Sequence, residues 1–389
     1  MSNNHTVAIV GTGYSKLERR SLRPLVLLAR DAATRAIAEA TLEVDQVDGL
    51  STYPVLAPFT RPDIEIVTVP SMQEALHLDD RVKWYCEPHE GMIGSGVVAA
   101  YHALRSGACD YALVWRALHM PKAGRYNAPP PMEVPDAFQF SAPYGLTGWN
   151  GLFSALYTRY FELNGGSREK LATLAVTQRS WANKNPDAFF HDVPLSVDEY
   201  MSSRMLSDVM CLYDCDVPID GACAIVMTTA ERAKDLDVTP AYITDIIQGG
   251  PKEAQLWDLE SAAGSMRHIA NRLWASTGLG PDDIDAAMLY DGFSLFPILW
   301  LEGLGFCAPG EGLDFIQDGR IGVGGQIPLN TGGGSLSQGR LHGLSHMIEA
   351  ARQVAGKAGE RQVPNARHAL ATVSFNNGGT ALAVSSSEP

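Results

Sequence analysis

Short apolar runs alternate along the chain with longer segments in which apolar residues recur every three or four positions. Residues 7–10, Val-Ala-Ile-Val, form a run that ends at Gly11-Thr12-Gly13, which predicts a strand closed by a turn. Residues 21–41 repeat small and apolar side chains at helical spacing, with Ser21 as the candidate N-cap. Further runs predict strands at 47–52 and 110–115 around a helix at 91–106. This alternation of strand and helix is typical of a layered, mostly parallel α/β fold.

The second part of the chain repeats that order. A turn and buried strand within 217–227 close the first part near residue 235. After it, the pattern predicts strands at 241–247, 286–290, 370–375 and 381–385, and helices near 259–276, 294–305 and 341–355. The chain therefore divides into two βαβαβ units, 1–235 and 236–389, which indicates an internal duplication of topology. We expect an active site where the two units meet.

Residues 117–205 interrupt the first unit. Periodicity weakens there and prolines gather, as in Pro129-Pro130-Pro131, around helices predicted near 150–164 and 167–184. Long irregular excursions within compact domains commonly carry function. We therefore expect this insertion to lie over the site.

Composition narrows the classes of function. The 389 residues are 46% hydrophobic and 19% charged, which is ordinary globular composition and enough chain for two cores. The formal charge of −14 argues against nucleic acid and anionic membrane surfaces as partners. No segment reaches the roughly 18 apolar residues of a membrane span, and the first residues lack an export signal. We expect a cytoplasmic location.

Cysteines and short glycine motifs predict neither a metal nor a nucleotide site. The six cysteines are scattered, which favours reduced thiols, and Cys211 with Cys215 lacks the second ligand pair of a zinc site. Gly11 and Gly13 could begin a dinucleotide fingerprint, but Lys16 stands where its third glycine belongs. A tight turn is the favoured interpretation of that pair.

The most unusual string is residues 328–343, Pro-Leu-Asn-Thr-Gly-Gly-Gly-Ser-Leu-Ser-Gln-Gly-Arg-Leu-His-Gly. Three consecutive glycines bring backbone N–H groups close to a ligand, and the next helix presents its positive N-terminal end nearby. That arrangement suits a carbonyl oxygen that gains negative charge. A glycine-rich connection without a ligand is the plainer alternative.

This run resembles the thiolase superfamily motif N-x-N-G-G-x-x-x-x-G-H-P-x-G. Asn330, Gly333, Gly334 and Gly339 match it, and Arg340 stands at the histidine of the motif. Three further segments resemble family motifs in order and spacing: Pro-Ile-Asp-Gly-Ala at 218–222, Tyr-Asp-Gly-Phe at 290–293 and Phe-Asn-Asn-Gly-Gly at 375–379. The resemblance covers nearly the whole chain and implies a five-layered αβαβα thiolase-like fold that forms a homodimer.

The chemical positions of the thiolase motifs are altered. Glu90 stands where the family keeps its nucleophilic cysteine, Cys86 lies one turn earlier, and Phe375 occupies the second cysteine position. A carboxylate cannot form the acyl thioester that a thiolate forms, and a phenyl ring cannot move a proton. Acyl-enzyme exchange is therefore disfavoured.

Within the superfamily, the chain resembles the lipid-transfer-protein-like aldolases of bacterial steroid side-chain degradation, which carry Y-D-x-F where residues 290–293 stand. The resemblance implies retro-aldol cleavage of a β-hydroxyacyl-CoA, with a steroid side chain as the expected acyl group and no covalent intermediate. It also implies a small partner protein with a zinc ribbon and an OB-fold. Coenzyme A enters only as part of the substrate.

By that match, Tyr290 is the first candidate for proton transfer. A tyrosine of pKa ~10 is a poor base at neutral pH unless cations stabilise its phenolate, and Arg340 is the candidate cation. His342, with an ordinary pKa of ~6.5, is the candidate for the second proton role, with a helix cap or surface residue as the alternative. His346, one turn later, is expected to be structural.

The remaining candidates contact substrate. Tyr144 belongs to a Pro-Tyr-Gly string that resembles the loop over the pocket of these aldolases, and Glu90 could orient a water or a substrate hydroxyl or lie in a solvated loop. The others in this group are Asp291, Asn330, Gly333 and Gly334. Two other functions stay open: an acyltransferase that uses Cys86 as a displaced nucleophile, and a non-catalytic acyl-CoA or sterol carrier.

Overall fold

The computed structural model describes residues 5–53, 65–88, 94–120, 139–140, 142–144, 149–250, 258–375 and 378–389. Within these ranges, nine strands form one sheet in the order β3-β2-β4-β5-β1-β6-β9-β8-β7. The strands are β1 (Val7–Tyr14), β2 (Gly49–Thr52), β3 (Trp84–Cys86), β4 (Tyr111–Leu118), β5 (Gly221–Thr229), β6 (Ala241–Gly249), β7 (Ala286–Met288), β8 (His368–Phe375) and β9 (Gly378–Ser385).

Helices pack on the outer sides of the sheet and between its two halves, β3 to β1 and β6 to β7. They are α1 (Leu25–Glu39), α2 (Val69–Leu76), α3 (Ser95–Ser106), α4 (Trp149–Asn164), α5 (Arg168–Asn183), α6 (Val197–Met201), α7 (Ala230–Ala233), α8 (Leu259–Thr277), α9 (Leu295–Leu304), α10 (Gly312–Phe315), α11 (Gly334–Ser337) and α12 (Leu344–Val354). Among the described helices, none combines the length and apolar composition that a bilayer crossing requires.

The sheet repeats one pairing plan on either side of its centre. In the first half, β1 pairs antiparallel with β5, β5 antiparallel with β4, and β4 parallel with β2. In the second half, β6, β9, β8 and β7 pair in the same senses. The halves join where Val7–Ile9 of β1 lies antiparallel to Ala241–Ile243 of β6. The predicted α/β fold with two pseudo-repeated halves is therefore confirmed. The predicted boundary at 235/236 falls between α7 and β6.

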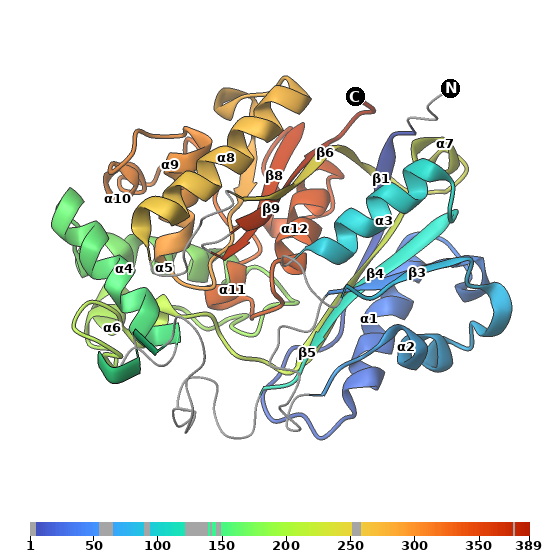
Figure 1. Ribbon diagram of the computed structural model, residues 1–389, viewed down its shortest axis with the longest axis horizontal. Coiled ribbons are helices and arrows are strands. Elements are labelled where there is room, and N and C mark those ends of the chain that lie inside the picture. Colours follow the sequence, from blue (N-terminus) through green and yellow to red (C-terminus); the bar gives the residue numbers. More distant parts are fainter. Residues whose placement is uncertain are drawn as a thin grey trace.

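The helices are arranged in layers around the sheet (Figure 1). α1 packs on β1, β4 and β5 from one outer side, and α8 packs on β6 and β9 from the other. α3 and α12 each contact strands of both halves, so they form the middle layer. Side chains of β1 alternate accordingly: Val7 and Ile9 join the core of the middle layer, while Ala8 and Val10 join the core under α1.

Two details at the start of the chain differ from the sequence-based prediction. β1 continues through Gly11 and Gly13, so the predicted turn there is wrong. A Cβ at Gly11 would lie 2.0 Å from the Ala36 carbonyl oxygen, which shows that the glycines let α1 approach the strand. The N-cap of α1 is Pro24 and not Ser21, whose backbone N–H instead donates to Asp220 at 2.7 Å.

The insertion is tied to the second half by a buried polar network around Asp214. This carboxylate accepts hydrogen bonds from the hydroxyls of Tyr200 at 2.6 Å and Ser294 at 2.7 Å. Tyr157 of α4 lies 3.0 Å from the Ser294 hydroxyl and accepts from the backbone N–H of Leu295. The start of α9, directly after the Tyr-Asp-Gly-Phe string, is therefore held by helices of the insertion.

Candidate active site

Two arginines and a histidine meet between the halves. Arg116 comes from β4, while Arg340 and His342 precede α12. The Arg116 guanidinium lies 2.7 Å from Nδ1 of His342, and the Arg340 guanidinium lies 3.2 Å from Nε2 of the same ring. All three side chains are buried, with 8%, 7% and 4% exposure respectively. We call this group the Arg–His–Arg cluster.

The cluster concentrates positive charge in a site shielded from water. A neutral imidazole has one acceptor nitrogen, so it can accept from only one of the two arginines at a time. Burial, and next the charge of Arg340, lower the pKa of Arg116 to about 10, which still leaves Arg116 cationic at neutral pH. Tyr53 and Tyr290 both lie within electrostatic range of Arg116, and the Tyr53 ring is 5.9 Å from its guanidinium carbon. Negative charge is favoured in this region of the site.

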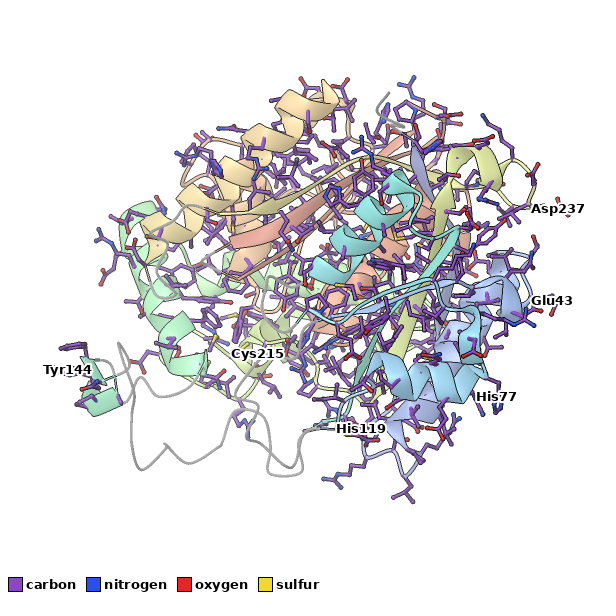
Figure 2. All side chains as sticks on the ribbon, turned by 45° about the vertical axis from the view of Figure 1, so that its right-hand side comes forward. Glu43, His77, His119, Tyr144, Cys215 and Asp237 are labelled. Carbon is purple, nitrogen blue, oxygen red and sulfur yellow. The ribbon has the colours of Figure 1, made fainter. Side chains whose placement is uncertain are left out.

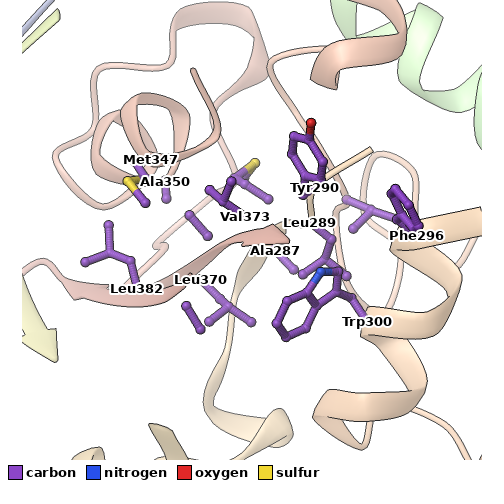
Figure 3. Packing of buried hydrophobic residues seen from close by; sticks show 14 of the residues in the cluster. Ala287, Leu289, Tyr290, Phe296, Trp300, Met347, Ala350, Leu370, Val373 and Leu382 are labelled. Carbon is purple, nitrogen blue, oxygen red and sulfur yellow. The ribbon is translucent and has the colours of Figure 1, made fainter. Parts of the chain in front are cut away.

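Tyr290 is fully buried beside the cluster, just after β7. Its ring stacks on Phe296 at 6.4 Å between centroids and lies 5.9 Å from the ring of His346. Its backbone N–H donates to the Thr372 hydroxyl at 3.1 Å. Figure 3 shows the phenol oxygen pointing away from the apolar residues around Leu289. Packing therefore fixes the ring, and the hydroxyl points away from these apolar residues.

Asp291, the next residue, anchors the glycine-rich run. Its carboxylate accepts from the backbone N–H groups of Ser335 at 2.7 Å and Leu336 at 3.1 Å, and lies 2.8 Å from Nε2 of His346. The Gly333 N–H donates to the Asn330 carbonyl at 2.8 Å. The expectation that the three glycines present their amides to a ligand is therefore wrong for Gly333, and the amides of Ser335 and Leu336 are also occupied within the protein.

The other matched residues of the run also have roles in packing. Asn330 has a φ of 50° and donates through its amide to the Leu289 carbonyl at 2.9 Å. A Cβ at Gly333 would lie 2.6 Å from the Ala182 side chain. A Cβ at Gly334 would lie 2.1 Å from the Asp291 carboxylate. Close packing of backbone on side chain explains why glycine stands at both positions.

The helix after the run begins later than predicted. His342 and Gly343 have φ values of 52° and 84°, in the left-handed region, so α12 starts at Leu344 and not at 341. This turn of the backbone directs the His342 ring toward Arg116 of the other half. The alternative interpretation of His342 as a cap or surface residue is excluded, because the ring is buried and Gly343 is the N-cap.

Not all candidates are brought together. Tyr144 is 82% exposed on a short turn that stands away from the rest of the described chain (Figure 2). Glu90 lies outside the described residues. Cys86 is on the edge strand β3, where burial, followed by the charge of Glu87, raises the pKa of its thiol. A thiol with a raised pKa is a weaker nucleophile at neutral pH.

The six cysteines, all within the described ranges, carry thiols and form no disulfide bonds. Over the described ranges, no three His, Cys, Asp or Glu side chains converge as a metal site would require. Arg116 is the site residue that sequence analysis missed, since the predicted strand at 110–115 stops one residue before it. The available signal was the position of Arg116 within a continuous apolar run, because arginine side chains are rarely buried unless they are paired.

Comparison with known proteins agrees with this arrangement. Residues 255–387 match the family described as Thiolase C-terminal domain-like. The chain is 31% identical over 379 residues to the 17-hydroxy-3-oxo-4-pregnene-20-carboxyl-CoA lyase of Mycobacterium tuberculosis, covering 94% of this chain and 95% of that protein. It is 32% identical to a steroid side-chain-cleaving aldolase of Thermomonospora curvata, with 90% of each chain covered.

Solved structures give the same assignment. An Ltp2-ChsH2(DUF35) aldolase superposes with a TM-score of 0.87 and 28% identity, covering 98% of this chain and 97% of that one. Human mitochondrial 3-ketoacyl-CoA thiolase superposes with a TM-score of 0.69 at 12% identity, a likeness of fold. The chain therefore belongs to the thiolase superfamily and, within it, to the lipid-transfer-protein-like aldolases that cleave steroid side chains.

Proposed function

We propose that this protein is a carbon–carbon lyase that cleaves a β-hydroxyacyl-CoA by a retro-aldol reaction, with a steroid side chain as the acyl group. The relatives that it matches over nearly their whole lengths are named as a carboxyl-CoA lyase and a side-chain-cleaving aldolase. One structural observation carries the assignment to this site: Tyr290 lies within electrostatic range of the buried Arg116.

In the proposed reaction, the Tyr290 phenolate takes the proton of the β-hydroxyl group. The electron pair of the Cα–Cβ bond moves to the thioester, which becomes an enolate, and the β-carbon becomes the carbonyl of a released ketone or aldehyde. The enolate then takes a proton at Cα, for which His342 is the candidate donor, and leaves as a shorter acyl-CoA. Atoms and charges balance without a covalent intermediate, and coenzyme A is needed only as part of the substrate.

Cationic neighbours make a tyrosine suitable for this role. Burial alone raises the pKa of a phenol, as it does for Tyr53. A cation beside a phenolate stabilises the charged form, and Arg116 is the cation within electrostatic range of Tyr290. The competing acyl-transfer function is disfavoured because the Cys86 thiol lies on an edge strand and has a raised pKa.

The proposal includes a homodimer and a small zinc-ribbon and OB-fold partner. Support for a partner comes from the solved aldolase, whose name joins two components, Ltp2 and ChsH2. Co-expression with the products of neighbouring genes, followed by size-exclusion chromatography with light scattering, tests both parts. A monomer that stays alone with every neighbouring product would contradict them.

The central experiment offers the purified complex a steroid-derived β-hydroxyacyl-CoA and follows release of the ketone and the shorter acyl-CoA. We expect Tyr290→Phe to lower kcat by about 10²–10⁴-fold, the usual contribution of a positioned acid or base. Tyr101→Phe is the matched control, because the Tyr101 hydroxyl contacts Arg105 on α3, outside the site. Unchanged turnover in Tyr290→Phe would remove this residue from the mechanism. Tight acyl-CoA binding without turnover in the wild type would favour the carrier function.

A further inference from the structure

Arg116 differs in its partners from Arg361 and Arg179, two other buried arginines. Arg361 is paired with Glu349 at 3.1 Å, and Arg179 donates to the Ser337 hydroxyl at 3.1 Å and the Val193 carbonyl. In the described part of the chain, Arg116 has no ion pair with a carboxylate, and its Nε has no hydrogen-bond partner. Its contacts are the His342 ring and the face of Tyr53. Among the described residues, this cation is therefore buried without a carboxylate beside it.

The surroundings of Arg116 add further positive charge. Arg340 lies across the His342 ring, and two guanidinium groups brought together in a buried site repel each other. α12 begins at Gly343 without a side-chain cap, so its positive end is directed to the same region. Side chains of both halves and a helix terminus thus favour an anion at one place. A buried arginine without a carboxylate beside it, as Arg116 is among the described residues, is costly to a fold, and function is the common reason for keeping it.

We propose that Arg116 is a catalytic residue that, with Arg340, holds the thioester oxygen when it becomes negative in the enolate. This inference rests on the proposed retro-aldol function. The amides of Ser335 and Leu336, which could have served this purpose, are occupied by Asp291. In a β-hydroxy thioester, the hydroxyl and carbonyl oxygens are on carbons one atom apart, so groups beside Tyr290 can reach the second oxygen. Fixed cations aimed at developing charge are an effective means of lowering a barrier.

Deuterium exchange at the α-carbon of propionyl-CoA separates this inference from the cleavage reaction. Exchange in D₂O needs only removal of an α-proton, charge on the thioester oxygen and return of a deuteron, with no carbon–carbon bond broken. We expect the wild-type complex to exchange, Arg116→Met to exchange about 10²–10³-fold more slowly, and Arg116→Lys to recover part of the rate. In the cleavage assay, Arg116→Met lowers kcat by a similar factor with KM little changed.

The outcomes are distinguishable. Exchange that depends on Arg116 in a protein that cleaves no β-hydroxyacyl-CoA would support the oxyanion role and refute the proposed function. Exchange or cleavage by Arg116→Met within threefold of the wild type would overturn the oxyanion role and leave the proposed function intact. A wild-type complex that neither exchanges nor cleaves would overturn both.

The melting temperature is a second measurement that distinguishes the oxyanion role of Arg116 from a purely structural role. Replacing an uncompensated buried cation with an apolar side chain of similar length removes a cost, so we expect Arg116→Met to melt at the wild-type temperature or above it. Arg361→Met is the matched comparison, because it leaves the buried Glu349 carboxylate without its ion-pair partner and should therefore lower the Tm. An equal loss of Tm in both variants would show that Arg116 supports the fold, and would overturn the proposal.

Discussion

The carboxylate of Asp291 lies 2.8 Å from Nε2 of His346, and the two side chains are 0% and 1% exposed. The same carboxylate accepts hydrogen bonds from two backbone N–H groups of the glycine-rich run. Asp291, which follows β7 and is adjacent to Tyr290, thus links β7 to α11 and α12. These hydrogen bonds hold the glycine-rich run in place beside Tyr290. His346 takes part in this contact, in agreement with the structural role expected of it.

Asp291→Asn tests this anchor. The amide oxygen of asparagine can replace one carboxylate oxygen, but its NH₂ group would face the other backbone N–H group. We expect the free energy of unfolding to fall by about 2–3 kcal/mol, the cost of a buried donor left unsatisfied beside a lost charged partner. Urea unfolding measures it. Asp31→Asn is the control, because its pair with Arg23 is partly exposed to solvent and surface ion pairs contribute little to stability. Equal losses in the two variants would contradict the anchor.

Gly334→Ala tests the close packing of the run on Asp291. The added Cβ would lie 2.1 Å from a carboxylate oxygen, and the φ of 60° adds strain, so we expect loss of more than about 3 kcal/mol or failure to fold. Gly278→Ala is the matched control, because its φ is 70° but no atom lies within 4 Å of the new Cβ. The control carries only the backbone cost of about 1 kcal/mol. Similar unfolding midpoints would show that packing at Gly334 is unimportant.

Acid stability depends on Glu349. Burial raises the pKa of this carboxyl, but the charge and hydrogen bonds of Arg361, with Arg352 and Thr331, outweigh burial and leave its pKa below the ordinary 4.5. A lowered pKa in the folded state stabilises the protein above pH 4.5, and that stability is lost as the pH falls through the folded value.

We therefore expect the free energy of unfolding to decline below pH 4.5 less steeply in Glu349→Gln than in the wild type. At pH 7 the variant is less stable by about 3–5 kcal/mol, because Arg361 stays buried without its partner. Urea unfolding across the pH range measures both effects. Glu260→Gln, on the exposed face of α8, should leave the slope unchanged. A wild-type slope in Glu349→Gln would refute the assignment.

Cys86 can be removed without loss of the proposed activity. A half-buried thiol of raised pKa carries little thiolate at neutral pH, and retro-aldol cleavage needs none. We expect Cys86→Ala to keep kcat within about twofold of the wild type, and iodoacetamide to leave cleavage unaffected. Loss of activity on alkylation that Cys86→Ala prevents would favour the acyltransferase.

The order of strands and helices could be predicted because each element has strong periodicity or a continuous apolar run. The predicted ends of elements are wrong where contacts of the backbone with other elements decide them. The glycines at 11 and 13 indicate a turn by themselves, and only the approach of α1 explains a strand there. Similarly, the left-handed φ values of His342 and Gly343 depend on the packing of α12, so the helix start could not be read from the pattern.

The site could be predicted only in part. Tyr290 and Arg340 were found by motif position and His342 by its place two residues after Arg340, and the structure brings the latter two into contact. Arg116 is 224 residues from Arg340 and belongs to no motif, so only the pairing of the halves reveals it. The opposite error occurred at Asp291, where a match to a family motif gave no indication that backbone amides would occupy the carboxylate.

The repeated strand pairing gives the two tyrosines beside Arg116 a common origin in the fold. Gly49 faces Ala112 in the first half as Ala286 faces Ala369 in the second, so Tyr53 and Tyr290 stand at equivalent places, four residues after each. By the same register, Arg116 corresponds to Val373. Each half therefore has a tyrosine at this place, but only the first half has an arginine on the neighbouring strand, where the second half has Val373. Tyr53, whose hydroxyl contacts the Met347 sulfur, is thus the counterpart of Tyr290 in the first half of the fold.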